Sequence, residues 1–144
     1  MLGTITVSAT PGTISFTLAA GAQAQGSAPV AIYTAGQNLS GLSSVSLYAY
    51  FASTNALTDT AGDTLPNTAL FGKDSSGTPT SYTAFTQSTP YSGSTGLLVY
   101  TTRDLVSLLS GRTDNLYLMI DLSSSPQLPA GTYNGTLFLE AQAF

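Results

Sequence analysis

The chain has 144 residues, of which 42% are hydrophobic and only 7% are charged, and its net charge is −4. This length fits a single domain, residues 1–144, that buries its own core. The only cations are Lys73, Arg103 and Arg112. Nucleic acids and anionic membrane surfaces both require clusters of basic side chains, so neither partner is expected. No apolar run approaches the roughly 20 residues that span a bilayer, so no transmembrane segment is expected either.

Cysteine and histidine are both absent. The chain therefore cannot build a disulfide, a thiolate nucleophile, a Ser-His-Asp triad or a His/Cys metal site. Sparse charge with abundant Ser, Thr and Gly favours β-structure over helix and suits a neutral, protease-exposed surface. We expect a secreted or cell-surface location. Because Met1 and Leu2 lead directly into a strand pattern without a secretory signal, we interpret the chain as a mature or expressed form.

The first predicted strand, Gly3 to Thr10, places Ile5, Val7 and Ala9 on one face and Ser and Thr residues on the other. After Pro11-Gly12, residues Thr13 to Leu18 repeat this alternation. Together they form either a hairpin or one strand that changes sheet at a kink. The first strand belongs either to an ordinary sandwich or to an extension that pairs with another subunit. The residues leave both interpretations open.

Further strands follow, and Ser44 to Ala52 is the clearest of them. It directs Val45, Leu47, Ala49 and Phe51 inward and places Tyr48 and Tyr50 on the opposite face. Other predicted strands are Pro29 to Thr34, Ala69 to Phe71, Ser81 to Thr86, Gly96 to Thr101 and Asn115 to Leu122, and Ala19 to Ala28 is predicted to be a loop. Arg103 to Leu109 is the one place where apolar spacing predicts a helical turn.

Carboxylate pairs and a Ser-Lys dyad are the remaining routes to chemistry, and Lys73 lacks the Ser-x-x-Lys spacing of the dyad. Asp59 and Asp63 lie in a turn-rich loop, Ser53 to Thr68, which allows a minor calcium hypothesis, although Asx turns explain the same residues and calcium requires six to eight oxygens. Asp121 and Glu140 are the only carboxylates on clear strands. A glycosidase needs two carboxylates facing one another across a cleft. Both are on outward positions, so solvated strand positions are the simpler interpretation, and no enzyme and no cofactor are expected.

The last nineteen residues, Pro126 to Phe144, are a Pro/Gly turn that leads into a long alternating strand. Leu137, Leu139, Ala141 and Ala143 share one face of it. A strand that runs to the end of the chain requires a neighbour, because free termini fray. With eight to ten strands expected along the chain and no strand–helix alternation, the sequence predicts an all-β, immunoglobulin-like β-sandwich.

The ending LPAGTYNGTLFLEAQAF resembles the C-terminal segment of fimbrial-type subunits, particularly the spore coat U-like secreted family of bacteria. Pro129, Gly131, Thr132 and Tyr133 match the turn, and the alternating strand after it matches in Leu137, Leu139 and Ala141. The resemblance implies an incomplete sandwich that polymerises by donor-strand exchange, a form of β-augmentation. It also implies that residues 1–10 are the candidate donor strand.

In such an assembly Ile5, Val7 and Ala9 would be the donor side chains, and Leu137, Leu139 and Ala141 would line the edge of the acceptor groove. We therefore expect a non-enzymatic structural subunit of an extracellular filament, pilus or coat. It would form a head-to-tail homopolymer, with an assembly chaperone or a cell-surface anchor as a further partner. The alternative is a carbohydrate- or surface-binding sandwich module that uses Tyr48 and Tyr50 as its ligand face. A hydrolase using Asp121 and Glu140 ranks third.

Overall fold

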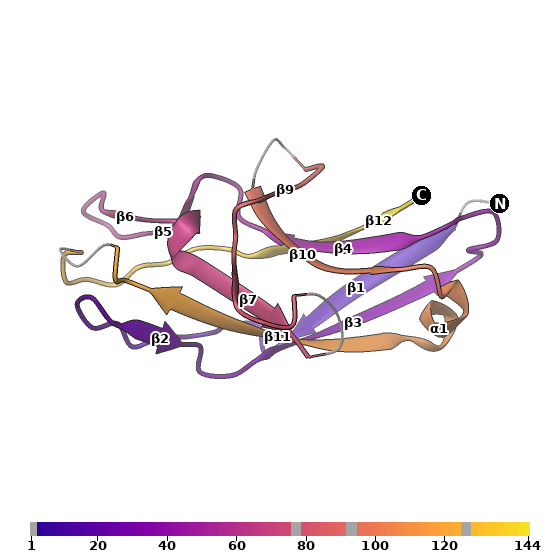
Figure 1. Ribbon diagram of the computed structural model, residues 1–144, viewed down its shortest axis with the longest axis horizontal. Coiled ribbons are helices and arrows are strands. Elements are labelled where there is room, and N and C mark those ends of the chain that lie inside the picture. The colour runs from indigo at the N-terminus through magenta and orange to yellow at the C-terminus, as the bar shows by residue number, and fades with distance from the viewer. Residues whose placement is uncertain (1–2, 76–78, 92–94, 125–127) are drawn as a thin grey trace.

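The protein is a sandwich of two antiparallel sheets with a short hairpin at one end, and Figure 1 shows the two layers running along the long axis. The structure, a computed structural model, describes residues 3–75, 79–91, 95–124 and 128–144. The prediction of an all-β sandwich is confirmed.

The first sheet has the strand order β1-β3-β11-β7-β8, and β2 pairs with the second half of β11. The second sheet has the order β12-β4-β10-β9. The strands of the first sheet are β1 (Thr4–Thr10), β2 (Gln23–Gln25), β3 (Val30–Gln37), β7 (Leu70–Asp74), β8 (Thr83–Ala84) and β11 (Arg112–Asp121). The strands of the second are β4 (Val45–Tyr50), β9 (Gln87–Ser88), β10 (Thr95–Thr102) and β12 (Phe138–Ala143).

The topology leaves β12 at the edge of its sheet. The long strands of the first sheet follow the order A-B-E-D of an immunoglobulin constant domain. In the second sheet β4 and β12 take the places of strands C and F, and β10 is an additional strand. In that domain a seventh strand, G, lies beyond F. Among the described residues no strand pairs with β12 on that side.

Inward-facing aliphatic and aromatic side chains fill the space between the sheets. Alternating residues of β4 and β10 meet those of β3 and β11, as the period of two requires. The fully buried members of this core are Ile32, Leu47, Ala49, Leu65, Phe85, Leu97, Val99, Leu116 and Ile120. A smaller cluster of Leu39, Val45 and Leu108 closes the end of the sandwich near α1 (Leu105–Ser110).

The helical turn predicted near residues 103–109 is present as α1. Asp104 precedes it, and its Oδ1 accepts a hydrogen bond from the backbone N–H of Ser107 at 3.3 Å, which is the usual N-cap interaction. Gly111 follows it with φ at 92°, a left-handed conformation that glycine adopts without strain. The turn-rich loop holds the hairpin of β5 (Asn55–Thr58) and β6 (Thr64–Pro66), and then the single turn η1 (Asn67–Ala69).

Three local predictions were wrong. Thr13 to Leu18 is extended but is not a strand, whereas Gln23–Gln25, predicted to be loop, pairs with Met119–Asp121. Strand β11 starts at Arg112 rather than at Asn115. The first two differences arise because strand assignment depends on which neighbouring backbone is within reach, which a local pattern does not contain.

The early start of β11 buries a charged pair inside a sandwich that has few charges. Arg112 donates to the carboxylate of Asp114 from Nε at 2.8 Å and from Nη2 at 3.0 Å, and Asp114 is fully buried. The guanidinium carbon also lies 3.8 Å from the centroid of the Tyr100 ring, a cation–π contact. These contacts compensate the loss of hydration of both charges.

Replacing Asp114 with Ala should lower the free energy of unfolding by about 3 kcal/mol, because the Arg112 guanidinium would remain largely buried without its carboxylate. Urea unfolding measures the change. The matched control is Asp121→Ala on the same strand, where the carboxylate is partly exposed and the loss should stay within about 1 kcal/mol. Equal unfolding midpoints for the two variants would contradict this interpretation of the pair.

Candidate functional site

Strand β1 is an edge strand that pairs within its own chain. All seven of its residues are in antiparallel register with β3, from Thr4 opposite Gln37 to Thr10 opposite Ala31. Of the predicted donor side chains, Ile5 and Val7 are half-buried and Ala9 is exposed. The arrangement is therefore that of a sandwich with its own first strand in place.

Strand β12 is the corresponding edge of the second sheet. It pairs with β4 from Phe138 opposite Tyr50 to Ala143 opposite Val45. The predicted groove residues Leu137, Leu139 and Ala141 are all half-buried and pack against the main core. The alternation that the sequence predicted is thus present, but its apolar face is only partly covered.

The two edges lie along the same side of the sandwich, where β1 and β12 are neighbours. Ile5 and Ala141 pack on the same small cluster around Leu39, and Val7 packs with Leu139 against the main core. The structure therefore brings the predicted donor row and the predicted groove row together, in one chain.

A loosely held segment connects β1 to β2. Residues 13–18 direct Ile14, Phe16 and Leu18 toward the core, where all three remain half-buried. Ser15 makes the only hydrogen bonds of this segment within the described chain: its C=O accepts from the Ser27 N–H at 2.8 Å and its N–H donates to the Ser27 hydroxyl at 3.1 Å. The sequence predicted the alternation here and did not predict the missing backbone pairing.

The predicted tyrosine face lies on the outside of the second sheet, where it belongs to a larger aromatic group. The Tyr50 ring stacks against Phe138 at a centroid distance of 5.4 Å and against Tyr91 at 5.3 Å, and Tyr48 meets Tyr91 edge-on at 5.9 Å. Tyr50 is only 7% exposed because both of its ring faces are covered. It cannot serve as the exposed ligand residue that the sequence suggested.

Tyr91 and Phe138 are members of this group that the sequence did not identify. Phe138 could have been found, since it follows the same outward alternation as Glu140 on the last strand. Tyr91 could not have been found, because it reaches the face from the loop between β9 and β10.

Glu140 and Tyr50 form a cross-strand hydrogen bond on this face. The Tyr50 hydroxyl donates to Oε1 of Glu140 at 3.0 Å. Burial, this hydrogen bond and the neighbouring carboxylate together raise the pKa of Tyr50 to about 12. The phenol is therefore a stable donor across the neutral pH range.

The two carboxylates considered as a catalytic pair, Asp121 and Glu140, belong to different sheets. Asp121 belongs to the first sheet, where it accepts hydrogen bonds from Gln23 and from the Ser123 N–H, whereas Glu140 belongs to the second. Asp59 uses Oδ1 to accept the backbone N–H groups of Ala61 and Asp63, as an Asx turn does. Within the described chain no three acidic residues gather as a metal-binding group.

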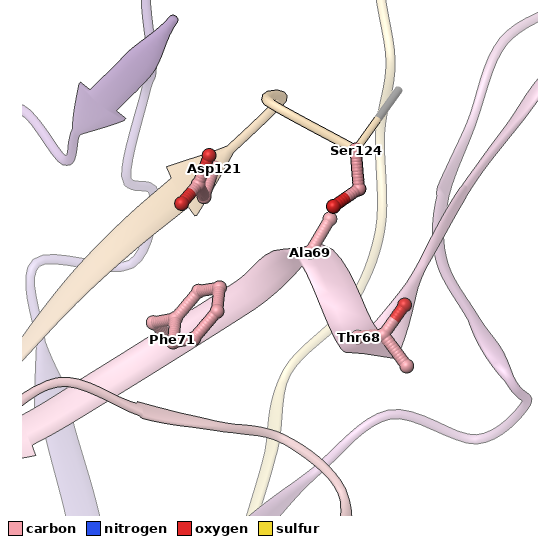
Figure 2. A pocket seen from close by; sticks show the side chains of 5 residues that line it. All are labelled: Thr68, Ala69, Phe71, Asp121 and Ser124. Carbon is pink, nitrogen blue, oxygen red and sulfur yellow. The ribbon is translucent and has the colours of Figure 1, made fainter. Parts of the chain in front are cut away.

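A small pocket of about 110 Å³ lies where β7 begins and β11 ends. Figure 2 shows the Phe71 ring and the Asp121 carboxylate from the two strands, with the Ser124 hydroxyl above the η1 turn. Its lining residues are Thr68, Ala69, Phe71, Asp121 and Ser124. Among the described lining residues Asp121 is the only ionisable group, and its carboxylate already accepts hydrogen bonds from Gln23 and from the Ser123 N–H.

A scan against protein-family models, a search of curated proteins and a search of solved structures each return no match for this chain. Among the described residues no helix is long and apolar enough to cross a membrane.

The raised pKa of Tyr50 predicts how stability changes in alkali. An unfolded tyrosine ionises near pH 10, so the folded state holds this proton more tightly. Its contribution to stability should be complete below about pH 10 and should be lost as the pH rises toward 12. The variant Tyr50→Phe lacks this ionisation, so its free energy of unfolding should fall less steeply over that range.

Urea unfolding of both proteins at a series of pH values between about 9 and 12 measures the difference. The pKa of Tyr100, which burial also raises, belongs to a residue outside this aromatic group and affects both proteins alike. Parallel curves for the two proteins would show that the Tyr50 phenol is not stabilised in the folded state.

Proposed function

We propose that this protein is a non-enzymatic structural subunit of an extracellular or cell-surface filament or coat, and that copies assemble by β-strand complementation. The observation that carries the proposal is the side of the sandwich bounded by β1 and β12. There Ile5, Val7, Leu137, Leu139 and Ala141 are only half-buried, and β1 forms the edge of its sheet. The resemblance of the C-terminal segment to fimbrial-type subunits supports the same function.

In the proposed assembly β1 of one copy takes the place of β1 in the next. The incoming strand pairs with β3 and directs Ile5, Val7 and Ala9 toward Leu137, Leu139 and Ala141. In the neighbouring copy β1 would make the same contacts with β3 that it makes in its own chain. The exchange therefore keeps all β1–β3 hydrogen bonds and links the two copies. Such head-to-tail contacts do not close and therefore build filaments.

The segment after β1 makes this exchange physically reasonable. Residues 13–18 are tied to the sandwich through Ser15 alone among the hydrogen bonds of the described chain, and their apolar side chains are half-buried. For β1 to leave its own chain, the segment that follows it must change conformation. Residues 13–18 can do so without breaking a ladder of backbone hydrogen bonds. On the scale of about 25 cal/mol per Å² of apolar area, Ile5 and Val7 supply the docking contribution, because Ala9 stays exposed.

Replacing Val7 with Asp should abolish filaments, because a carboxylate cannot be buried between β3 and β12 at this position. The matched control is Thr6→Asp, which places the same charge on the exposed face of the same strand. Negative-stain electron microscopy of both variants reads out assembly, and near-ultraviolet circular dichroism checks that each retains a packed core. Filaments formed by Val7→Asp at the wild-type level would contradict the proposal.

A disulfide between β1 and β3 should report whether β1 is exchanged. Ser8 and Tyr33 are opposite one another in register and are both exposed, and the chain has no cysteine of its own. The double variant Ser8→Cys/Tyr33→Cys, assembled and then oxidised, should run as a covalent ladder on a non-reducing gel. The unassembled protein at low concentration should run as a cross-linked monomer.

The matched control is an equimolar mixture of the two single variants, Ser8→Cys and Tyr33→Cys, which can form the disulfide only between chains. The exchange would be overturned if the assembled double variant gave only a monomer band and the mixture gave no dimer. That result would show that β1 stays in its own chain.

A further inference from the structure

The outer face of the second sheet carries an aromatic group with a single carboxylate. Tyr48 and Tyr50 lie two residues apart on β4, Phe138 and Glu140 lie opposite them on β12, and Tyr91 lies against both tyrosines. Phe138 is 39% exposed, and Tyr48 and Tyr91 are partly exposed. This face is on the opposite side of β12 from the row of Leu139 and Ala141, so it is not the assembly edge proposed above.

The rings are fixed before any ligand arrives. Tyr50 lies between Phe138 and Tyr91 at interplanar angles of 21° and 14°, and its hydroxyl is held by Glu140. Beside this group the hydroxyls of Ser46 and Thr101 are within 2.9 Å of each other. Rigid aromatic side chains lose little conformational entropy on binding, which favours their use as contact surfaces.

Glu140 provides a directional polar contact beside the rings. It is exposed, and only one of its carboxylate oxygens accepts a hydrogen bond from the described residues, the one from Tyr50. The other oxygen can accept from a hydroxyl group. No cation–π contact lies on this face among the described residues. On the outside of the first sheet, by contrast, Nζ of Lys73 lies 4.7 Å from the Tyr82 ring centroid and 5.6 Å from that of Tyr117.

We infer that this face binds a neutral oligosaccharide. Sugar rings present apolar C–H faces that pack on aromatic rings and carry hydroxyls at their rims that donate to a carboxylate. Anionic ligands are disfavoured by Glu140 and by the net charge of −4. A second protein copy is disfavoured by size, because a standard interface needs about 800 Å² from each partner and three partly exposed rings provide much less.

The rings of Phe138, Tyr48 and Tyr91 form the contact surface, and Glu140 orients the ligand. Tyr50 acts as a positioning residue that holds both the rings and the carboxylate. The proposal does not depend on strand exchange, because the edge of β1 is not part of this face.

Binding can be measured on the full chain with cellohexaose and mannohexaose as neutral probes and an oligogalacturonide as the anionic one. Isothermal calorimetry measures binding, and tyrosine fluorescence is a second signal, to which Tyr48, Tyr50 and Tyr91 contribute three of the eight tyrosines of a chain without tryptophan. At least one neutral probe should bind, and the anionic probe should bind at least tenfold more weakly. Phe138→Ala and Tyr48→Ala should each weaken neutral binding about tenfold, the loss of about 1.4 kcal/mol per ring contact.

The matched control is Tyr117→Ala, which removes an equally exposed tyrosine from the outside of the first sheet and should leave binding unchanged. Glu140→Gln should weaken binding while keeping the fold, as checked by thermal unfolding. The inference is overturned if neither neutral probe binds, or if Phe138→Ala and Tyr48→Ala bind as the wild type does. It is also overturned if light scattering shows a dimer that Phe138→Ala dissociates without sugar.

Discussion

Unpaired strand edges in a chain with very few charges are the constraint on which the rest of this structure depends. Natural sheets protect their edges with charged side chains, proline or bulges. Here β1 contains no charged residue, and β12 contains only Glu140, which points outward and is bonded to Tyr50. The outer edges of β1 and β12 therefore have almost no charge to protect them. Whether β1 pairs with its own chain or with another, the position beside β3 must be filled.

The two edges are held with different strength. Strand β12 is fixed from both faces, since Leu139 packs inward while Phe138 stacks on Tyr50 and Glu140 accepts the Tyr50 hydroxyl. Strand β1 has its ladder to β3 and two half-buried side chains, Ile5 and Val7, and is followed by a weakly paired segment. This asymmetry suits the proposed exchange, in which β1 leaves its own chain and β12 stays in place.

The sequence predicted what periodicity determines. The alternation in β4, β11 and β12 located the strands and their inward faces, because a half-buried strand must place its apolar residues two apart. The predicted donor and groove rows also lie on neighbouring edges. Buried charge was harder to predict: Asp114 is fully buried because Arg112, two residues away on the same strand, bonds to it.

Long-range contacts account for the other differences. Nothing in the residues around Tyr91 indicates that its ring lies against β4, and Tyr50 is buried only because Phe138 and Tyr91 cover it. Likewise, Gln23–Gln25 has no apolar alternation to identify it and becomes a strand because the edge of β11 is within reach. A local pattern specifies a face, and the tertiary structure decides what covers it.

The described ends of the chain meet at one pole of the molecule, as Figure 1 shows. Gly3 lies against the backbone of Gln37 and Asn38, where the turn after β3 begins. The C=O of Phe144 accepts a hydrogen bond from the Ser43 N–H, and its N–H donates to the C=O of Ser44, where that turn ends. A circular permutant that joins these ends and opens the chain in the β5–β6 hairpin would keep both sheets. In that permutant β1 would be tethered at both ends, so its release from β3 would no longer free an end of the chain.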